Sequence, residues 1–195
     1  MPVRVFSEEE KEEIKEKMFE AGLKLIKEYG LTHASVTKIT QAAGIGKSTF
    51  YNFFESKEVF VIALIRYERE KAMQMIHQHL SGRKQMTKEE GKKLLYMIIY
   101  HQDSIYQYLT EEDVKNLYPA MEKAGFIEED LNSDTPQYLL DIIEGTRKDV
   151  DPKVFVNFLR MMALCIAQKD ALHQDVLQQN IDMIFEKMFE YIFED

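Results

Sequence analysis

The sequence predicts an all-α protein. Glycine and proline are scarce, at eight and four of 195 residues, so few positions would interrupt a helix. Apolar residues make up 45% of the chain, which is enough for a core, and they recur every three or four positions as in amphipathic helices. We therefore expect a three-helix head and a larger helical body, with predicted domains at 1–57 and 58–195.

The head is predicted to contain three helices. Ser7 opens the first with the sequence pattern of a capping box, and Gly30 ends it. Ser35 is placed to cap a second, short helix that Gly44 closes. The third helix is predicted at 47–54, where apolar residues again lie one turn apart.

The body begins with a long fourth helix, predicted from Ser56 to about His79. The polar stretch 81–85 then interrupts the helical pattern. Five further helices are predicted, with glycines and prolines marking the breaks, at roughly 87–109, 111–123, 135–147, 152–169 and 173–193.

The net charge of −9 by itself argues against a nucleic-acid partner. Most of the excess acid lies in residues 61–195, which carry sixteen Lys and Arg against twenty-four Asp and Glu, a net charge of −8. Residues 1–60 carry nine against ten, and no acidic residue occurs between Tyr29 and Phe54. A locally positive surface can therefore form in the head.

Cysteine usage and hydropathy indicate a cytoplasmic protein. The single cysteine, Cys165, excludes an internal disulfide and is typical of a reducing compartment. The N-terminal residues lack the apolar segment of a signal peptide. No uncharged apolar run approaches the roughly 18 residues that a membrane span needs, so we expect no membrane partner.

The stretch QAAGIGKSTFYNFF, residues 41–54, admits two interpretations. Gly46, Lys47 and Ser48 look like the end of a phosphate-binding loop. That loop requires another glycine five residues before Gly46, where this chain has Gln41, and a buried strand before it. The preceding residues have helical periodicity instead, so we reject the nucleotide-binding interpretation.

A helix-turn-helix fits the same stretch better. It requires two short helices, a tight turn that often contains glycine, and a second helix with one solvent-exposed face. In the helix at 47–54, Phe50 and Phe54 share an inward face, while Ser48 and Asn52 lie opposite. The outer face, with Thr49 and Tyr51 at its sides, is hydrogen-bonding and free of acid, as a reader of the DNA major groove requires.

Residues 35–58 resemble the DNA-binding signature of the TetR (tetracycline-repressor) family. The matching positions are Ala42-Ala43-Gly44-Ile45, Thr49, Tyr51, Phe54 and Ser56-Lys57-Glu58. Thr40, Gly46, Ser48 and Phe53 depart from the residues that the family usually has there, so the operator sequence cannot be carried over. The resemblance places Lys47 and Lys57 beside the DNA backbone. The predicted DNA-binding residues are Ser35, Lys47, Ser48, Thr49, Tyr51, Asn52 and Lys57.

The last two predicted helices carry more apolar surface than one chain needs. The helix at 152–169 is apolar nearly all round, which predicts burial on every side, either in a single larger core or against a second copy. The resemblance favours the second copy, because the family dimerises through its last two long helices. The predicted interface residues are Phe158, Met162, Ile181, Ile184, Phe185 and Met188.

Tyrosines and methionines are frequent in the body, and together they suit an apolar or amphipathic small molecule. Ordinary core packing is the alternative for each of them. The predicted ligand-binding residues are Tyr96, Tyr100, Tyr108, Met161 and Cys165.

The sequence carries no pattern typical of catalysis. His77 and His79 lie about 200° apart on a helix and cannot ligate one metal together. We therefore expect no enzyme, no metal and no cofactor. The predicted function is a dimeric, ligand-responsive transcriptional repressor that binds a palindromic operator through a helix-turn-helix. The alternative is a helical adaptor or scaffold that binds another protein.

Overall fold

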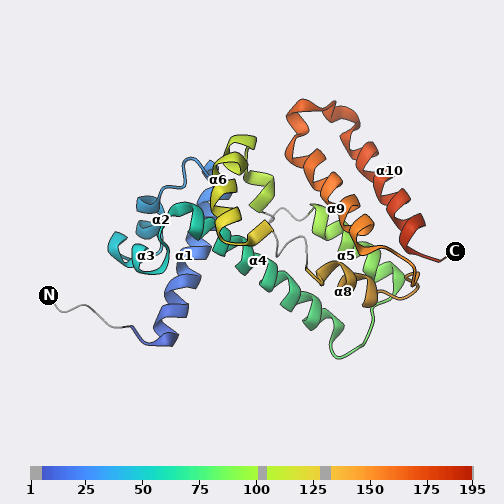
Figure 1. Cartoon of the computed structure of the whole chain (residues 1–195), viewed down its shortest axis with the longest axis horizontal. Coiled ribbons are helices and arrows are strands. Elements are labelled where there is room, and N and C mark those ends of the chain that lie inside the picture. Colours follow the sequence, from blue (N-terminus) through green and yellow to red (C-terminus); the bar gives the residue numbers. More distant parts are fainter. Residues whose placement is uncertain (1–5, 101–104, 128–132, 195) are drawn as a thin grey trace. The chain divides into compact units, whose positions relative to one another are not determined.

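The computed structural model describes residues 6–100, 105–127 and 133–194, and every regular element within them is helical (Figure 1). The all-α fold class is therefore confirmed. The elements are α1 (Glu8–Tyr29), α2 (Val36–Ala42), α3 (Lys47–Phe53), α4 (Lys57–Leu80), α5 (Lys88–Tyr100), η1 (Ile105–Tyr108), α6 (Glu111–Lys123), α8 (Thr135–Asp141), α9 (Pro152–Ala167), η2 (Lys169–Ala171) and α10 (Gln174–Ile192).

The chain divides into two compact units. Unit 1 consists of Met1–Lys71 and Tyr108–Glu128, so it contains α1 to α3, the first part of α4, and α6. Unit 2 consists of Ala72–Gln107 and Glu129–Asp195. The predicted boundary between residues 57 and 58 falls inside unit 1, at the start of α4. That it separates a DNA-binding part from an effector-binding part stays a prediction.

Polar side chains define where the helices of unit 1 begin. The Ser7 hydroxyl accepts a hydrogen bond from the Glu10 backbone N–H at 3.1 Å, and the Glu10 carboxylate accepts one from the Ser7 N–H at 2.9 Å. This reciprocal capping box satisfies two of the donors that a helix start leaves free. At the other end of α1, Gly30 has φ 77°, a conformation that glycine adopts without steric cost.

A cluster of phenylalanine rings forms the core of unit 1. The buried Phe60 ring of α4 has its centroid 5.7, 5.4 and 5.2 Å from those of Phe19, Phe50 and Phe54. Gly22 of α1 lies directly against it, because a Cβ atom at this position would be 2.6 Å from Phe60 Cζ. The absence of a side chain at Gly22 thus lets α1 and α4 approach closely, and α3 packs on the resulting aromatic surface.

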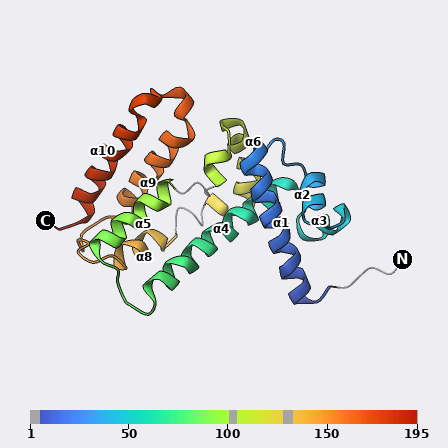
Figure 2. The same cartoon turned by 180° about the vertical axis from the view of Figure 1, so that it is seen from behind.

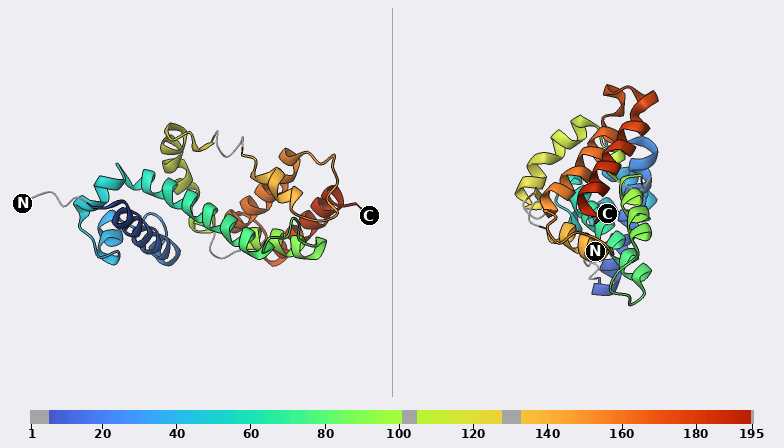
Figure 3. Two further views of the ribbon diagram at one scale, coloured as in Figure 1. Left: turned by 90° about the horizontal axis from the view of Figure 1, so that it is seen from below. Right: turned by 90° about the vertical axis from the view of Figure 1, so that its right-hand side faces the viewer.

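Unit 2 is built around α9 and α10, which lie side by side (Figure 2; Figure 3). The core also receives residues from the end of α4, from α5 and from α8. The buried side chains include Leu95, Leu139, Phe155, Met162, Ile181, Phe185, Met188 and Ile192.

The helix predicted at 135–147 is shorter in the structure and ends at Asp141. The residues that follow form turns and pair with other segments: the Met86 N–H donates to the Ile142 carbonyl at 2.8 Å, and the Arg147 N–H donates to the Ile192 carbonyl at 2.9 Å. Gly145, with φ 76°, turns the chain between these contacts. The helix predicted at 87–109 comprises α5 and η1, and residues 101–104 between them lie outside the described residues.

Candidate nucleic-acid interface

The turn between α2 and α3 has the geometry of a helix-turn-helix. Ser35 caps α2, its hydroxyl accepting a hydrogen bond from the Lys38 N–H at 3.3 Å. Gly44 has φ 69° and ends the helix, and the Ile45 N–H donates to the Thr40 carbonyl at 3.0 Å. The chain therefore reverses direction tightly before α3 begins at Lys47.

The two faces of α3 separate as the sequence predicts. Phe50 and the following Phe54 are buried in the aromatic core, whereas Ser48 and Asn52 are exposed. Tyr51 keeps 49% of its surface exposed while its ring edge contacts Phe50, at 5.4 Å between centroids. A rigid aromatic base therefore holds an outer face of small polar groups, which is the arrangement that groove reading requires.

Most of the predicted DNA-binding residues are accessible to solvent. Ser35 and Lys47 are exposed, and Thr49 is half-buried. Glu55, the first acidic residue after α3, forms an ion pair with Lys123 of α6 at 2.8 Å. The negative charge of Glu55 is thus offset by Lys123.

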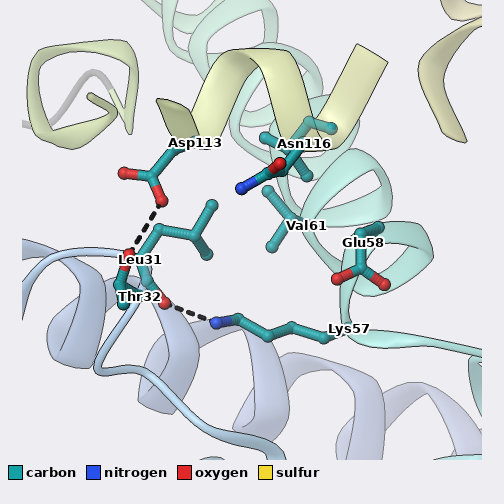
Figure 4. A pocket seen from close by; sticks show the side chains of 8 residues that line it. Leu31, Thr32, Lys57, Glu58, Val61, Asp113 and Asn116 are labelled. Carbon is teal, nitrogen blue, oxygen red and sulfur yellow. Dashed lines mark hydrogen bonds between the residues drawn. The ribbon is translucent and has the colours of Figure 1, made fainter. Parts of the chain in front are cut away.

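Lys57 has a different environment from Lys47. Its side chain is half-buried, and its Nζ donates a hydrogen bond to the Leu31 carbonyl in the turn between α1 and α2 (Figure 4). Burial lowers the pKa of Lys57 below its usual value, and the carboxylates of Glu58 and Asp113 partly offset that shift. Because the ammonium group is used inside unit 1, we leave Lys57 out of the proposed DNA surface.

The predicted ligand-binding residues are divided between the two units. Tyr96 and Tyr100 belong to unit 2, where the Tyr96 ring lies 4.0 Å from the Phe185 ring and the Tyr100 hydroxyl accepts a hydrogen bond from Gln178 Nε2 at 2.6 Å. Burial raises the pKa of both phenols, so both stay neutral and keep a proton to donate. Tyr108 belongs to unit 1.

The two remaining ligand candidates lie on α9, where Cys165 packs half-buried against the core and Met161 is exposed. Tyr108 is therefore in a different unit from the other four predicted ligand-binding residues.

The predicted dimer residues need a correction. Met162, Ile181, Phe185 and Met188 are at most 1% exposed in the single chain, because they form the core of unit 2. They have no surface left for a second copy; Phe158 and Ile184 are half-buried.

The exposed faces of α9 and α10 carry other apolar residues, which the predicted set omitted. Leu164, 63% exposed, and Met183, 56% exposed, are the most accessible of them. The full group is Val154, Met161, Leu164, Val176 and Met183. We take these five residues as the candidate interaction surface of unit 2. The sequence spacing of Val154, Met161 and Leu164 places them on one face of a helix. Spacing alone does not show whether that face is buried or exposed.

Two negative observations concern the described residues alone. Nowhere in 6–100, 105–127 and 133–194 do three or more His, Cys, Asp or Glu side chains gather in a way that could hold a metal ion. None of the helices in these ranges has both the length and the apolar composition to cross a bilayer.

The structure resembles solved regulators over nearly the whole chain. The fatty acid degradation regulator FadR from Bacillus halodurans is 17% identical with a TM-score of 0.56, and the match covers 95% of this chain and 96% of that one. NalD from Pseudomonas aeruginosa, the secondary repressor of the MexAB-OprM multidrug efflux pump, is 17% identical with a TM-score of 0.56, covering 94% and 98%. At this identity the likeness establishes the fold. No curated protein matches the chain by sequence.

A family model supplies the sequence evidence. Residues 19–64, from within α1 to within α4, match the model described as bacterial regulatory proteins, tetR family. The match contains the complete helix-turn-helix and the phenylalanines that support it. The match thus relates this N-terminal segment, with its helix-turn-helix, to the tetR family of bacterial regulatory proteins.

Proposed function

We propose that the protein is a dimeric transcriptional repressor that binds a palindromic operator and that a small molecule releases. The observation that carries the proposal is the exposed, acid-free face of α3, held on a buried aromatic core within the segment that matches the tetR family. The match to the tetR family model supports a regulatory protein over an enzyme or an adaptor. We propose a cytoplasmic location, because a bacterial regulator must reach operator DNA there.

On this proposal, α3 enters the major groove, and the predicted DNA-binding residues make two kinds of contact. Lys47 and Ser35, at the starts of α3 and α2, face phosphates, which fix the position of the protein on the duplex. Ser48, Thr49, Tyr51 and Asn52 offer hydroxyl and amide groups to base edges, which carry the sequence information.

The first test is retention of genomic DNA fragments at physiological salt, followed by alanine substitutions. We expect Lys47→Ala to weaken binding equally on all sequences and to lower the salt slope by about one unit, because a phosphate contact releases one counterion. Ser48→Ala and Thr49→Ala should instead change which sequences bind.

Lys84→Ala, an exposed lysine of unit 2, is the control for loss of one positive charge. If Lys47→Ala changed sequence preference while Ser48→Ala and Thr49→Ala did not, the assignment of the two kinds of contact would be wrong. If no DNA duplex bound in a salt-dependent manner, the proposed function would be excluded.

The exposed apolar faces of α9 and α10 support dimerisation. In a two-fold dimer each residue of such a face contributes twice, so a modest patch gives a stable interface. A dimer carries two copies of α3 and would bind two half-sites about 34 Å apart or a little more. A palindromic operator follows from that symmetry.

We place the effector site in unit 2, against the half-buried rings of Tyr96, Tyr100 and Phe189. The rings supply apolar surface, while the Tyr100 hydroxyl and Gln178 supply hydrogen bonds that fix orientation. An apolar or amphipathic effector fits this chemistry. The two similar proteins described above are a regulator of fatty acid degradation and a repressor of a multidrug efflux pump.

The effector should lower operator affinity by about 5- to 150-fold, the range that a coupling of about 1–3 kcal/mol gives. Linkage requires that operator DNA weaken the effector by the same factor. Titrating the effector with and without operator DNA measures both sides of this relation. Equal effector affinity in the two titrations would show that the small molecule does not regulate DNA binding.

A further inference from the structure

The start of α6 carries a buried carboxylate that contacts the DNA-binding head. Asp113 is 5% exposed, and its two oxygens have different partners. Oδ2 accepts hydrogen bonds from the Thr110 N–H at 2.9 Å and from the Thr110 hydroxyl at 2.8 Å, which caps α6. Oδ1 accepts a hydrogen bond from the Thr32 hydroxyl at 3.2 Å. Thr32 lies 81 residues earlier, in the turn between α1 and α2 (Figure 4).

The same turn is held from a second side by α4. Lys57, the first residue of α4, donates its hydrogen bond to the carbonyl of Leu31, the neighbour of Thr32. Leu31 is buried, and it lines a pocket of about 220 Å³ together with Val61 of α4 (Figure 4). Leu117 of α6 lines the same pocket. Two consecutive residues of one turn are thus fixed to two helices.

Further contacts hold α6 along its length to the rest of unit 1. Lys123 near its end pairs with Glu55, as described above. The Arg66 guanidinium of α4 donates a hydrogen bond to the Ala124 carbonyl at 3.1 Å, directly after the end of α6. Arg69 of α4 lies over the buried Phe126 ring at 4.8 Å. Because α6 is fixed at both ends, its buried carboxylate is a rigid anchor for the turn.

We infer that Thr32 and Asp113 are positioning residues for DNA binding: their hydrogen bond holds the α1–α2 turn on α6 and so orients the helix-turn-helix. The chain passes from Thr32 to the start of α2 at Val36 in four residues, so a displacement of the turn moves α2, and α3 with it. The inference rests on the proposed function for its DNA readout. Neither residue belongs to α3, so neither is part of the face that we propose contacts bases.

The experiment compares Thr32→Val with Thr32→Ser. Valine keeps the shape and removes the hydroxyl, whereas serine keeps the hydroxyl. A hydrogen bond to a charged group contributes about 1.5–3 kcal/mol, which sets an upper bound of about 10- to 150-fold on the affinity lost. We expect Thr32→Val to lose at least about fivefold in operator affinity, and Thr32→Ser to remain close to the wild type.

Half-site spacing separates positioning from simple loss of folded protein. A loosened head should tolerate operators with one base pair added or removed, so Thr32→Val should reduce the preference for the best spacing. A smaller folded fraction would lower binding to all spacings by one factor and leave that preference unchanged. In an Asp113→Ala background, Thr32→Val should have no further effect, because the partner is already absent.

Hydrogen exchange measured without DNA distinguishes a failure of the Thr32–Asp113 anchor from a failure of the proposed function. Thr32→Val should raise amide exchange across residues 36–53, and Thr32→Ser should not. If Thr32→Val raised exchange but the wild-type protein bound no operator, the anchor would be supported and the proposed function would be overturned. Unchanged exchange together with an unchanged spacing preference would overturn the anchor, whatever the operator affinity of the wild type.

Discussion

Replacing Leu164 and Met183 together with lysine is expected to convert the dimer into monomers. Both side chains lie on the exposed faces of α9 and α10, so lysine is accommodated in the single chain. Each lost apolar contact costs about 1.5–3 kcal/mol. Four side chains change in a two-fold interface, so the dissociation constant should rise on the order of 10⁴-fold or more.

Analytical ultracentrifugation over a range of protein concentrations measures the change. Met97→Lys on α5 is the matched control, because this methionine is 55% exposed and gains the same charge. The double variant should also lose binding to the palindrome while keeping weak, salt-sensitive binding to a half-site. A double variant that remained dimeric at nanomolar concentration would exclude this face as the interface.

Phe60→Ala should abolish operator binding by unfolding the head. Phe60 is fully buried, and its ring contacts three other phenylalanines of unit 1. Truncation of a buried phenylalanine to alanine costs about 3–5 kcal/mol, a large share of the roughly 5–15 kcal/mol that stabilises a typical protein. Since α3 is held through Phe50 and Phe54, its outer face would lose its orientation first.

Thermal unfolding followed by circular dichroism, with hydrogen exchange resolved along the chain, tests this prediction. Exchange should rise in residues 8–71 and change little in 133–194, because unit 2 has its own core. Phe60→Leu refills most of the cavity and should lose much less stability. A Phe60→Ala protein with wild-type operator affinity would show that the aromatic cluster does not support α3.

The helix-turn-helix could be predicted from sequence because its determinants are local. The capping by Ser35, the glycine turn and the inward face of Phe50 all lie within about twenty residues of one another. Each follows from the geometry of one or two helical turns. The structure accordingly places the predicted inner and outer faces of α3 where periodicity puts them.

The role of Lys57 could not be predicted in this way. A lysine at a helix start has the same local pattern whether it faces DNA or the interior. Its acceptor, the Leu31 carbonyl, lies 26 residues away, and only the folded chain brings the two together. The bond from Thr32 to Asp113 was missed for the same reason, although the capping box of Thr110 and Asp113 is itself a local pattern.

The dimer residues were chosen wrongly because an apolar helix does not reveal which of its faces the chain uses itself. Residues such as Met162 and Phe185 form the core of the single chain. Leu164 and Met183 are also apolar, but they are exposed. Periodicity yields two stripes, and packing within the chain decides which one remains exposed.

The composition of unit 1 has a consequence for synthesis of the protein. The unit combines residues up to Lys71 with a second stretch that begins at Tyr108, and the ribosome must make residues 72–107 between them. At about 5–20 residues per second this takes about 2 to 7 seconds. During that interval the buried Leu31 and Val61 lack the cover of Leu117. The nascent head is therefore exposed to chaperones and proteases until α6 emerges, and the DNA-reading helix reaches its final orientation only after more than half of the chain has been translated.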